Sequence, residues 1–218
     1  MLKKFFTATF ILMMIVTLGN VNVSAANTGK SKIAVVLDAP VGMFSKPEKV
    51  YSIVQKTLGN IFKDGTFYEI IPIEETDPYV QIYREENDLV GAVTPQGVAV
   101  ESFLKKDDID KICTHFEGDY LIYIRVSSTA PEISTGFFSA SQKVNVTMDF
   151  RIWSDSAKDF SYMKRTTSTG SSTAIYAGIG SATKALEDGL KKGLTEIEKD
   201  KVKIRKLMDT YGFGNNKD

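Results

Sequence analysis

Residues 144–170 decide the fold, and they read VNVTMDFRIWSDSAKDFSYMKRTTSTG. Over residues 144–152 apolar side chains alternate with polar ones, which is the two-residue period of a strand with one buried face. The polar segment 155–158 predicts a turn, and residues 160–168 predict an antiparallel partner strand. The stretch therefore predicts a hairpin in an antiparallel meander.

The first half of the chain has a different pattern. Residues 33–37 read IAVVL, a continuous apolar run typical of a strand buried on both faces and central in its sheet. Pro47 can begin a helix, because apolar residues then recur at helical spacing as far as Phe62. Residues 67–73 predict a second strand. A strand, a helix and a strand in one sheet form a right-handed crossover in nearly all cases.

Further helices and a strand are expected downstream. Asp77-Pro78 predicts a capped helix running to about Leu89, while residues 90–100 fit a loop or a short strand. Either Asp107 or Asp108 can cap the next helix, and the strand 121–126 follows it.

A last long helix is predicted over about residues 173–199, and its apolar stripe should pack across the sheet. The stripe comprises Ile175, Ile179, Ala182, Leu186, Leu190, Leu194 and Ile197. The expected fold class is α/β: a mixed sheet with a strand-helix-strand first half, an antiparallel meander and a long C-terminal helix packed on the sheet. We expect a single domain over residues 26–200 and a basic, partly disordered tail over 201–218.

The N-terminal segment predicts where the protein works. Lys3 and Lys4 precede an apolar run over residues 5–18, and Val23-Ser24-Ala25 supplies small residues for a signal peptidase. The run is shorter than the roughly 20 residues that span a bilayer. Residues 1–25 are therefore predicted to be a cleaved signal peptide, and the mature protein to be secreted or periplasmic without a transmembrane helix.

Composition narrows the possible functions. The 27 basic and 27 acidic residues balance, and loss of Lys3 and Lys4 leaves 25 − 27 = −2, so no overall field favours nucleic acid. Cys113 is the only cysteine and His115 the only histidine. Two positions apart on a helix they point in different directions, which argues against a nucleophile pair or a zinc site. We expect no cofactor and no metal.

Several acidic residues could act on a ligand or simply be solvated. Asp38 ends the predicted central strand, where open sheets often bind ligands, and is a possible ligand-binding residue; the alternative is a loop or cap residue. Glu74 and Glu85 lie in acidic groups that fit solvated helix ends or a catalytic carboxylate pair. Convergence of these three with Asp155 in one cleft would favour a secreted carboxylate-dependent hydrolase.

The best candidate for a partner contact is Phe137-Phe138. This aromatic pair lies among Ser, Thr, Ala and Gly in the segment 127–141. Exposed aromatic pairs mark contact sites, although both rings could instead fold over an edge of the sheet. The predicted partner is an envelope protein, a wall component or a second copy of the chain.

Three segments together carry a family resemblance. They read DIDKICTHFEGDYLIYIRV (108–126), the hairpin 144–170, and AIYAGIGSATKALEDGLKKGL (174–194). In this order they resemble the periplasmic domain of the curli secretion protein CsgG, of the lipoprotein activators of penicillin-binding proteins, and of the TolB amino-terminal domain. The resemblance covers roughly residues 31–198 and implies a non-catalytic envelope binding or assembly module. The lipidated cysteine of the lipoprotein members is missing here.

Overall fold

The structure is a computed structural model. It describes residues 29–40, 42–63, 67–90, 102–136, 139–175 and 180–212. The predicted signal peptide, residues 1–25, and the predicted Phe137-Phe138 contact lie outside the described residues, as do 91–101 and 213–218.

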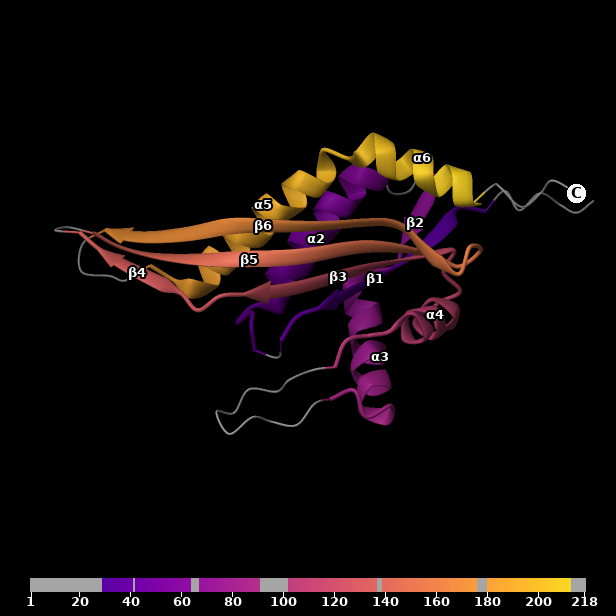
Figure 1. Cartoon of the computed structure of the whole chain (residues 1–218), viewed down its shortest axis with the longest axis horizontal. Helices are drawn as coiled ribbons and strands as arrows, with labels where there is room; N and C mark the ends of the chain where they lie inside the picture. The colour runs from indigo at the N-terminus through magenta and orange to yellow at the C-terminus, as the bar shows by residue number, and fades with distance from the viewer. Residues whose placement is uncertain are drawn as a thin grey trace, which may run out of the picture.

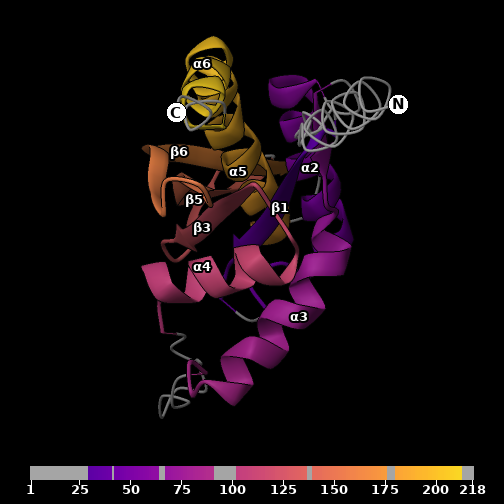
Figure 2. The same ribbon diagram turned by 90° about the vertical axis from the view of Figure 1, so that its right-hand side faces the viewer.

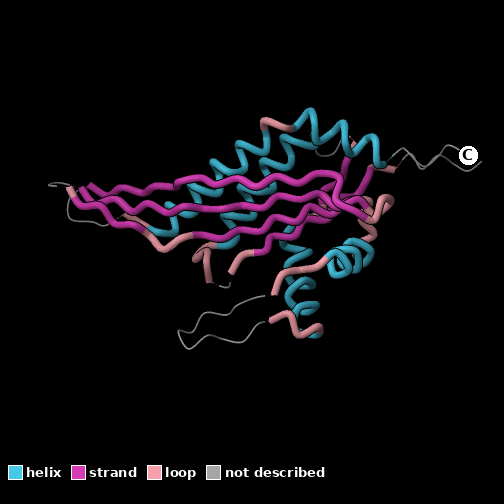
Figure 3. The backbone as a smooth tube through the Cα atoms, viewed as in Figure 1, coloured by secondary structure: helices cyan, strands magenta, loops and turns pink. Residues whose placement is uncertain are grey.

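Strands and helices follow one another in a mixed order (Figures 1 and 3). The order is β1 (Ser31–Asp38), α2 (Pro47–Phe62), β2 (Tyr68–Ile70), α3 (Ile73–Glu86), α4 (Lys106–His115), β3 (Tyr120–Ser128), β4 (Glu132–Thr135), β5 (Ser139–Ser154), β6 (Asp159–Ile175), α5 (Ala182–Glu198) and α6 (Lys201–Gly212).

The strands form one mixed sheet. β1 lies between β2 and β3 and is parallel to both, so the prediction of a central first strand is confirmed. β5 is antiparallel to β3, β4 and β6. β3 pairs with residues 146–154 of β5 and β4 with residues 140–143, so β4 continues along β5 where β3 ends. The predicted fold class is confirmed, and the predicted hairpin is longer than the periodic stretch that indicated it.

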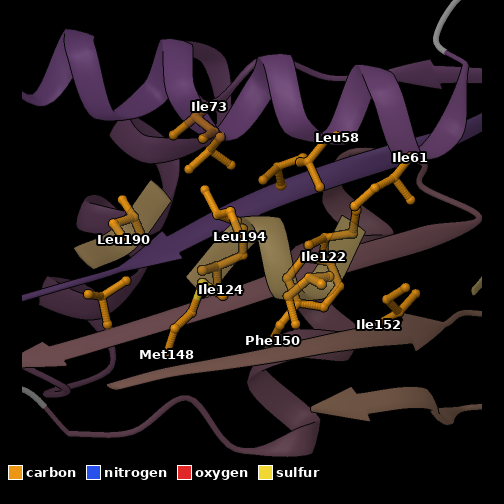
Figure 4. Close-up of a cluster of buried hydrophobic side chains, with 14 of the residues drawn as sticks. Leu58, Ile61, Ile73, Ile122, Ile124, Met148, Phe150, Ile152, Leu190 and Leu194 are labelled. Carbon is orange, nitrogen blue, oxygen red and sulfur yellow. The ribbon is translucent and has the colours of Figure 1, made fainter. Parts of the chain in front are cut away.

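The sheet separates two apolar clusters because alternate residues of each strand face opposite sides. On one side α2, α5 and α6 cover the sheet, and on the other α3 and α4 do (Figure 2). The first cluster joins Ile122 and Phe150 of the sheet to Leu58, Leu190 and Leu194 of the helices (Figure 4). The second joins Val36, Tyr123 and Trp153 to residues of α3 and α4.

Helix α5 lies unusually close to β6. A Cβ atom added to Gly170 would lie 1.8 Å from the Ala185 carbonyl oxygen and 2.5 Å from the Gly189 nitrogen. Only glycine leaves room for the backbones to approach this closely. The contact fixes the helix against the hairpin.

Two predicted boundaries near α3 are wrong. The predicted strand 67–73 is a three-residue strand, because Pro72 interrupts it and α3 begins at Ile73. Consequently Pro78 lies inside the helix and not at its first position. Burial decides the earlier start: Ile73 and Thr76 are fully buried, and the Thr76 hydroxyl donates a hydrogen bond to the Val35 carbonyl.

The starts of α4 and α5 also differ from prediction. Lys105 is the N-cap of α4, and Asp108 lies three residues further on, where its carboxylate accepts a hydrogen bond from the Lys105 backbone N–H at 2.8 Å. Helix α5 begins at Ala182, and residues 173–175 belong to β6. The Ser/Thr run continues the strand, and the Ser181 hydroxyl then caps the helix by accepting from the Lys184 N–H.

Part of the predicted basic tail is folded. Residues 201–212 form α6, and Ile204 and Met208 are fully buried in the first cluster. Arg205 donates to the Asn60 carbonyl at 3.0 Å, and the Tyr68 hydroxyl donates to Asp209 at 3.1 Å. The core therefore continues beyond residue 200, where the domain was expected to end.

Candidate functional site: a charged row across the sheet

Four charged residues lie side by side across four adjacent strands. The register pairs Asp38 of β1 with Arg125 of β3, Arg125 with Asp149 of β5, and Asp149 with Arg165 of β6. Two positions earlier on β1 and β3 are Val36 and Tyr123, which α3 and α4 cover. The charged row thus begins where the helical cover of this face ends.

Asp38 is the buried end of the row. Its side chain is 7% exposed and forms a 2.9 Å salt bridge with Arg84 of α3, which is 2% exposed. The Tyr123 hydroxyl donates a hydrogen bond to the second carboxylate oxygen. Burial and the Asp38 charge raise the pKa of Tyr123 well above its ordinary value. Arg84 also donates to the Ser102 carbonyl at 3.0 Å, so the pair ties α3 to β1 and to the segment before α4.

Arg125 is stacked but not paired. Its guanidinium carbon lies 3.1 Å from the centre of the Phe103 ring, and Phe103 itself is 64% exposed. The Nη1 atom of Arg125 is buried and has no hydrogen-bond partner among the described residues. A buried donor without a partner carries a desolvation cost that a ligand can offset.

Asp149 and Arg165 form the exposed end of the row. Arg165 donates two hydrogen bonds to the carboxylate, at 2.7 and 2.8 Å, in a bidentate arrangement. These bonds, with added charge effects from Arg151 and Arg125, hold the pKa of Asp149 below its ordinary value despite partial burial.

Together with the neighbouring Arg84 and Arg151, the row carries an excess of positive charge. Arg151 lies beside it on β5 and contacts the Phe160 ring, at 5.6 Å from the ring centre. Among the described residues, Arg84 and Arg165 have carboxylate partners, whereas neither Arg125 nor Arg151 has a salt bridge. Two positive charges are therefore unbalanced on a protein that is close to neutral overall.

The hairpin beyond the row is open on this face. Thr167 and Thr169 of β6, which lie on the side of the row away from the β5–β6 turn, are exposed, as is Arg165 in the row itself. Figure 1 shows α3 and α4 near the β5–β6 turn, with the distal half of the hairpin extending past them. The open face is long, polar and positively charged at its base.

The carboxylates proposed for catalysis do not converge. Asp38 lies at the end of β1, whereas Asp155 lies in the β5–β6 turn at the opposite end of the sheet, where its N–H donates to the Asp119 carbonyl. Glu74 accepts from Gln55 of α2, and Glu85 is exposed in the last turn of α3. Two catalytic carboxylates of a glycosidase lie about 5–10 Å apart on one cleft, and this arrangement is not found for these four.

A small cavity lies at the opposite end of the sheet from the charged row. It has a volume of about 110 Å³ and is lined by Ser31, Asp119, Tyr120, Asp155 and Ser156. Ligand pockets usually measure roughly 300–1,000 Å³. No group of three or more His, Cys, Asp or Glu side chains within the described residues could hold a metal ion.

The cysteine and the histidine are separate, as predicted. Cys113 is fully buried, its thiol donates to the Gly118 carbonyl, and burial raises the pKa of the thiol to about 12. His115 is exposed and stacks on Tyr79, with 3.6 Å between ring centres. Neither geometry suits an activated nucleophile.

Sequence reasoning selected Asp38 but missed Arg84, Arg125 and Arg151. Arg125 directly follows a run of buried residues in β3, and Arg151 alternates with apolar residues in β5. The charge of Arg125 directly after a run of apolar residues could have marked it as a candidate site residue. The pairing of those strands was needed to place the charges in one row.

Comparisons with known proteins give only distant matches. No protein-family model matches the sequence, and no curated protein matches it significantly. Among solved structures, the hypothetical protein CT253 from Chlamydia trachomatis is 9% identical, with a TM-score of 0.38, covering 86% of this chain and 100% of that one.

Two further solved structures match at a similar level. Lipoprotein GNA1162 from Neisseria meningitidis is 14% identical with a TM-score of 0.37, covering 80% of this chain and 99% of that one. The LpoB C-terminal domain from Escherichia coli is 12% identical with a TM-score of 0.33, covering 71% and 91%. Matches this distant carry no argument about function.

Proposed function

We propose that this protein is a binding or assembly module of the bacterial cell envelope, secreted or periplasmic, that performs no catalysis. The uncovered face of the β5–β6 hairpin, with unpaired arginines at its base, is the observation that carries the proposal. A polar, positively charged sheet face held on a rigid core suits contact with a partner. The signal-peptide pattern of residues 1–25 and the resemblance to the CsgG and TolB domains support the location. In the described part of the chain no helix has the length and apolarity to cross a membrane.

The partner contact is proposed to include Phe137-Phe138. In the sequence this pair lies between Gly136 and Ser139, and the Gly136 N–H donates to the Ser139 carbonyl at 2.6 Å. All four residues of β4 are exposed, and Ile133 is 58% exposed. Ile133 thus presents an apolar side chain to water on the strand that precedes the aromatic pair in the sequence, which supports a contact surface in this part of the chain.

Site-specific cross-linking in cells tests the proposed contact face. A photoreactive residue at Thr167, exposed on the open face, should form a cross-link to an envelope component. The cross-linked product should have the same mass in repeated experiments. The same residue at Ser52, exposed on α2, is the matched control. Equal adduct yields at both positions, or no adduct at Thr167, would contradict the proposal.

A double variant tests the aromatic pair. Phe137→Ser with Phe138→Ser should leave the melting temperature nearly unchanged and reduce the Thr167 adduct or self-association measured by ultracentrifugation. Unfolding of the double variant as a monomer would place both rings in the core and remove them from the contact.

Mass spectrometry and N-terminal sequencing of protein recovered from the envelope or medium test export. The mature N-terminus should be Ala26. An intact Met1 or a lipid-modified terminus would contradict cleavage after Ala25.

The hydrolase alternative has a direct test as well. Chromogenic ester and glycoside substrates should show no turnover above buffer. Turnover that disappears in Asp38→Asn would overturn the non-catalytic proposal.

A further inference from the structure

We propose that Arg125 and Arg151 form a binding site for a carboxylate group supplied by a ligand. The inference deepens the proposed binding function and rests on it for the identity of the natural partner. The site itself is defined by geometry that can be tested on the isolated protein.

The pattern of pairing in the charged row indicates the ligand class. The buried Arg84 is paired with the carboxylate of Asp38, and the exposed Arg165 is paired with that of Asp149. Arg125 and Arg151, which lie between them on β3 and β5, lack such a partner among the described residues. A guanidinium fork matches the planar carboxylate through two parallel hydrogen bonds. The row therefore lacks the two carboxylates that would balance it.

The two free arginines are close enough to act together. Arg125 is directly opposite Asp149, and Arg151 is the next residue of β5 on the same face. Diagonal neighbours of this kind have Cα atoms about 7–8 Å apart, within reach of long side chains. One carboxylate can bridge both guanidinium groups, and a dicarboxylate can occupy both.

Two aromatic rings hold the arginines in place. Phe103 stacks on Arg125, and Phe160 contacts Arg151. Stacking limits the rotamers of each guanidinium, so less entropy is lost when a ligand binds. The Nη1 atom of Arg125 is buried, and the low dielectric around it strengthens the attraction of the guanidinium to an anion.

The chain contains a convenient reporter for this site. Trp153 is the only tryptophan; it lies on β5 two residues from Arg151 on the same face and contacts Phe160, with 5.5 Å between ring centres. Binding at Arg151 should therefore change the tryptophan fluorescence.

The test is a fluorescence titration of the mature protein at constant ionic strength. Succinate represents a free dicarboxylate, an acetylated tetraglutamate amide represents an acidic protein segment, and inorganic phosphate is the comparison anion. Saturable binding of succinate or of the peptide is expected, with phosphate weaker. Binding of the peptide alone would assign the site to an acidic segment of a protein, and equal affinity for succinate would assign it to small carboxylates.

Variants of Arg125 and Arg151 test whether these two residues are responsible for carboxylate binding. Arg125→Gln with Arg151→Gln should weaken carboxylate binding at least about tenfold, because charged hydrogen bonds are lost. Lys191→Gln, at an exposed position of α5, has the same charge change per site and should bind like the wild type. If the double variant melts early, Arg151→Lys keeps the charge but loses the fork, and it should still weaken binding.

Three results would overturn the site. They are no saturable binding of either carboxylate, unchanged binding in the folded Arg125 and Arg151 variants, and tighter binding of phosphate than of carboxylate. Loss of this site with an intact Thr167 cross-link would leave the proposed function standing, so the two failures are distinguishable.

Discussion

The two faces of the sheet differ in how they are covered. On one face α2, α5 and α6 bury the full alternation of β5 from Val144 to Ile152. On the other, the cover from α3 and α4 stops at the charged row, and the hairpin beyond it is open. Residues 144–152 of β5 encode both faces at once, because their even-numbered positions are apolar and their odd-numbered positions are polar or charged. This division assigns stability to the covered face and leaves the open face available for binding.

The largest expected effect concerns the contact between α5 and β6. Gly170→Ala places a methyl group against backbone atoms of Ala185 and Gly189, and the helix must move away. The cost should be on the order of 5 kcal/mol of unfolding free energy, or outright loss of the fold. Guanidinium denaturation monitored by circular dichroism measures it.

Gly59→Ala is the matched control for that variant. Gly59 lies in α2 with open space around its missing Cβ, so alanine should stabilise the protein by up to about 1 kcal/mol. Similar midpoints for the two variants would show that α5 does not lie against the hairpin as described.

The next largest loss of unfolding free energy is expected when the buried pair of Asp38 and Arg84 is broken. Arg84→Met leaves Asp38 as an uncompensated buried charge, and about 3–5 kcal/mol should be lost. Adding Asp38→Asn should restore part of it, which a double-mutant cycle in urea would quantify. Arg165→Met, whose side chain is 67% exposed, should cost at most about 1 kcal/mol. If Arg84→Met and Arg165→Met lost equal unfolding free energy, the inner end of the row would be no more buried than the outer end.

The apolar stripe of α5 provides a third test of how much the covered face contributes to stability. Leu190 is fully buried against the sheet, and Leu190→Ala should cost about 2–5 kcal/mol. Lys191, the next residue, is exposed, and Lys191→Ala should stay within about 0.5 kcal/mol. If both variants unfold at the same denaturant concentration, the stripe does not face the sheet.

Periodic apolar patterns predicted the elements of this fold well. The central strand β1, the hairpin of β5 and β6, and most of the α5 stripe follow from the spacing of apolar residues, because burial of those residues determines which elements pack together. Boundaries were predicted less well. Proline usually lies in the first turn of a helix, but Pro78 lies inside α3, because burial of Ile73 and Thr76 starts the helix earlier.

The candidate site could be predicted only in part. Asp38 was selected as a possible ligand-binding residue from its position after a buried run, and ligand binding there stays a prediction. In the structure it forms a salt bridge with Arg84, which is 46 residues away in another element. The row exists only because the register places Arg125 beside Asp149 and Asp149 beside Arg165. The β5–β6 register follows from the turn that joins these strands, whereas the β1–β3 register pairs segments far apart in the chain, which local spacing does not encode.

The smallest expected effect is on the open face, and it depends on pH. The hydrogen bonds from Arg165 lower the pKa of Asp149 in the folded state, so folding favours the ionised carboxylate. The pair should therefore stabilise the protein fully above about pH 4, the ordinary range of an aspartate. This contribution should disappear as pH falls through the lowered pKa of the folded state. Asp149→Asn should lose about 0.5–1 kcal/mol at pH 7, because the pair is partly exposed to solvent.

Urea melts of the wild type and of Asp149→Asn between pH 2 and pH 8 test this sign. Their difference should be constant from about pH 5 to pH 8 and should shrink below about pH 4. Arg165→Gln is the control, since it removes the same bond from the other side and should show the same profile. Asp149→Asn should also bind succinate more tightly than the wild type, because it removes the negative charge beside Arg125 and Arg151. A stability difference that persists unchanged at pH 2 would mean that Asp149 contributes through packing and not through its charge.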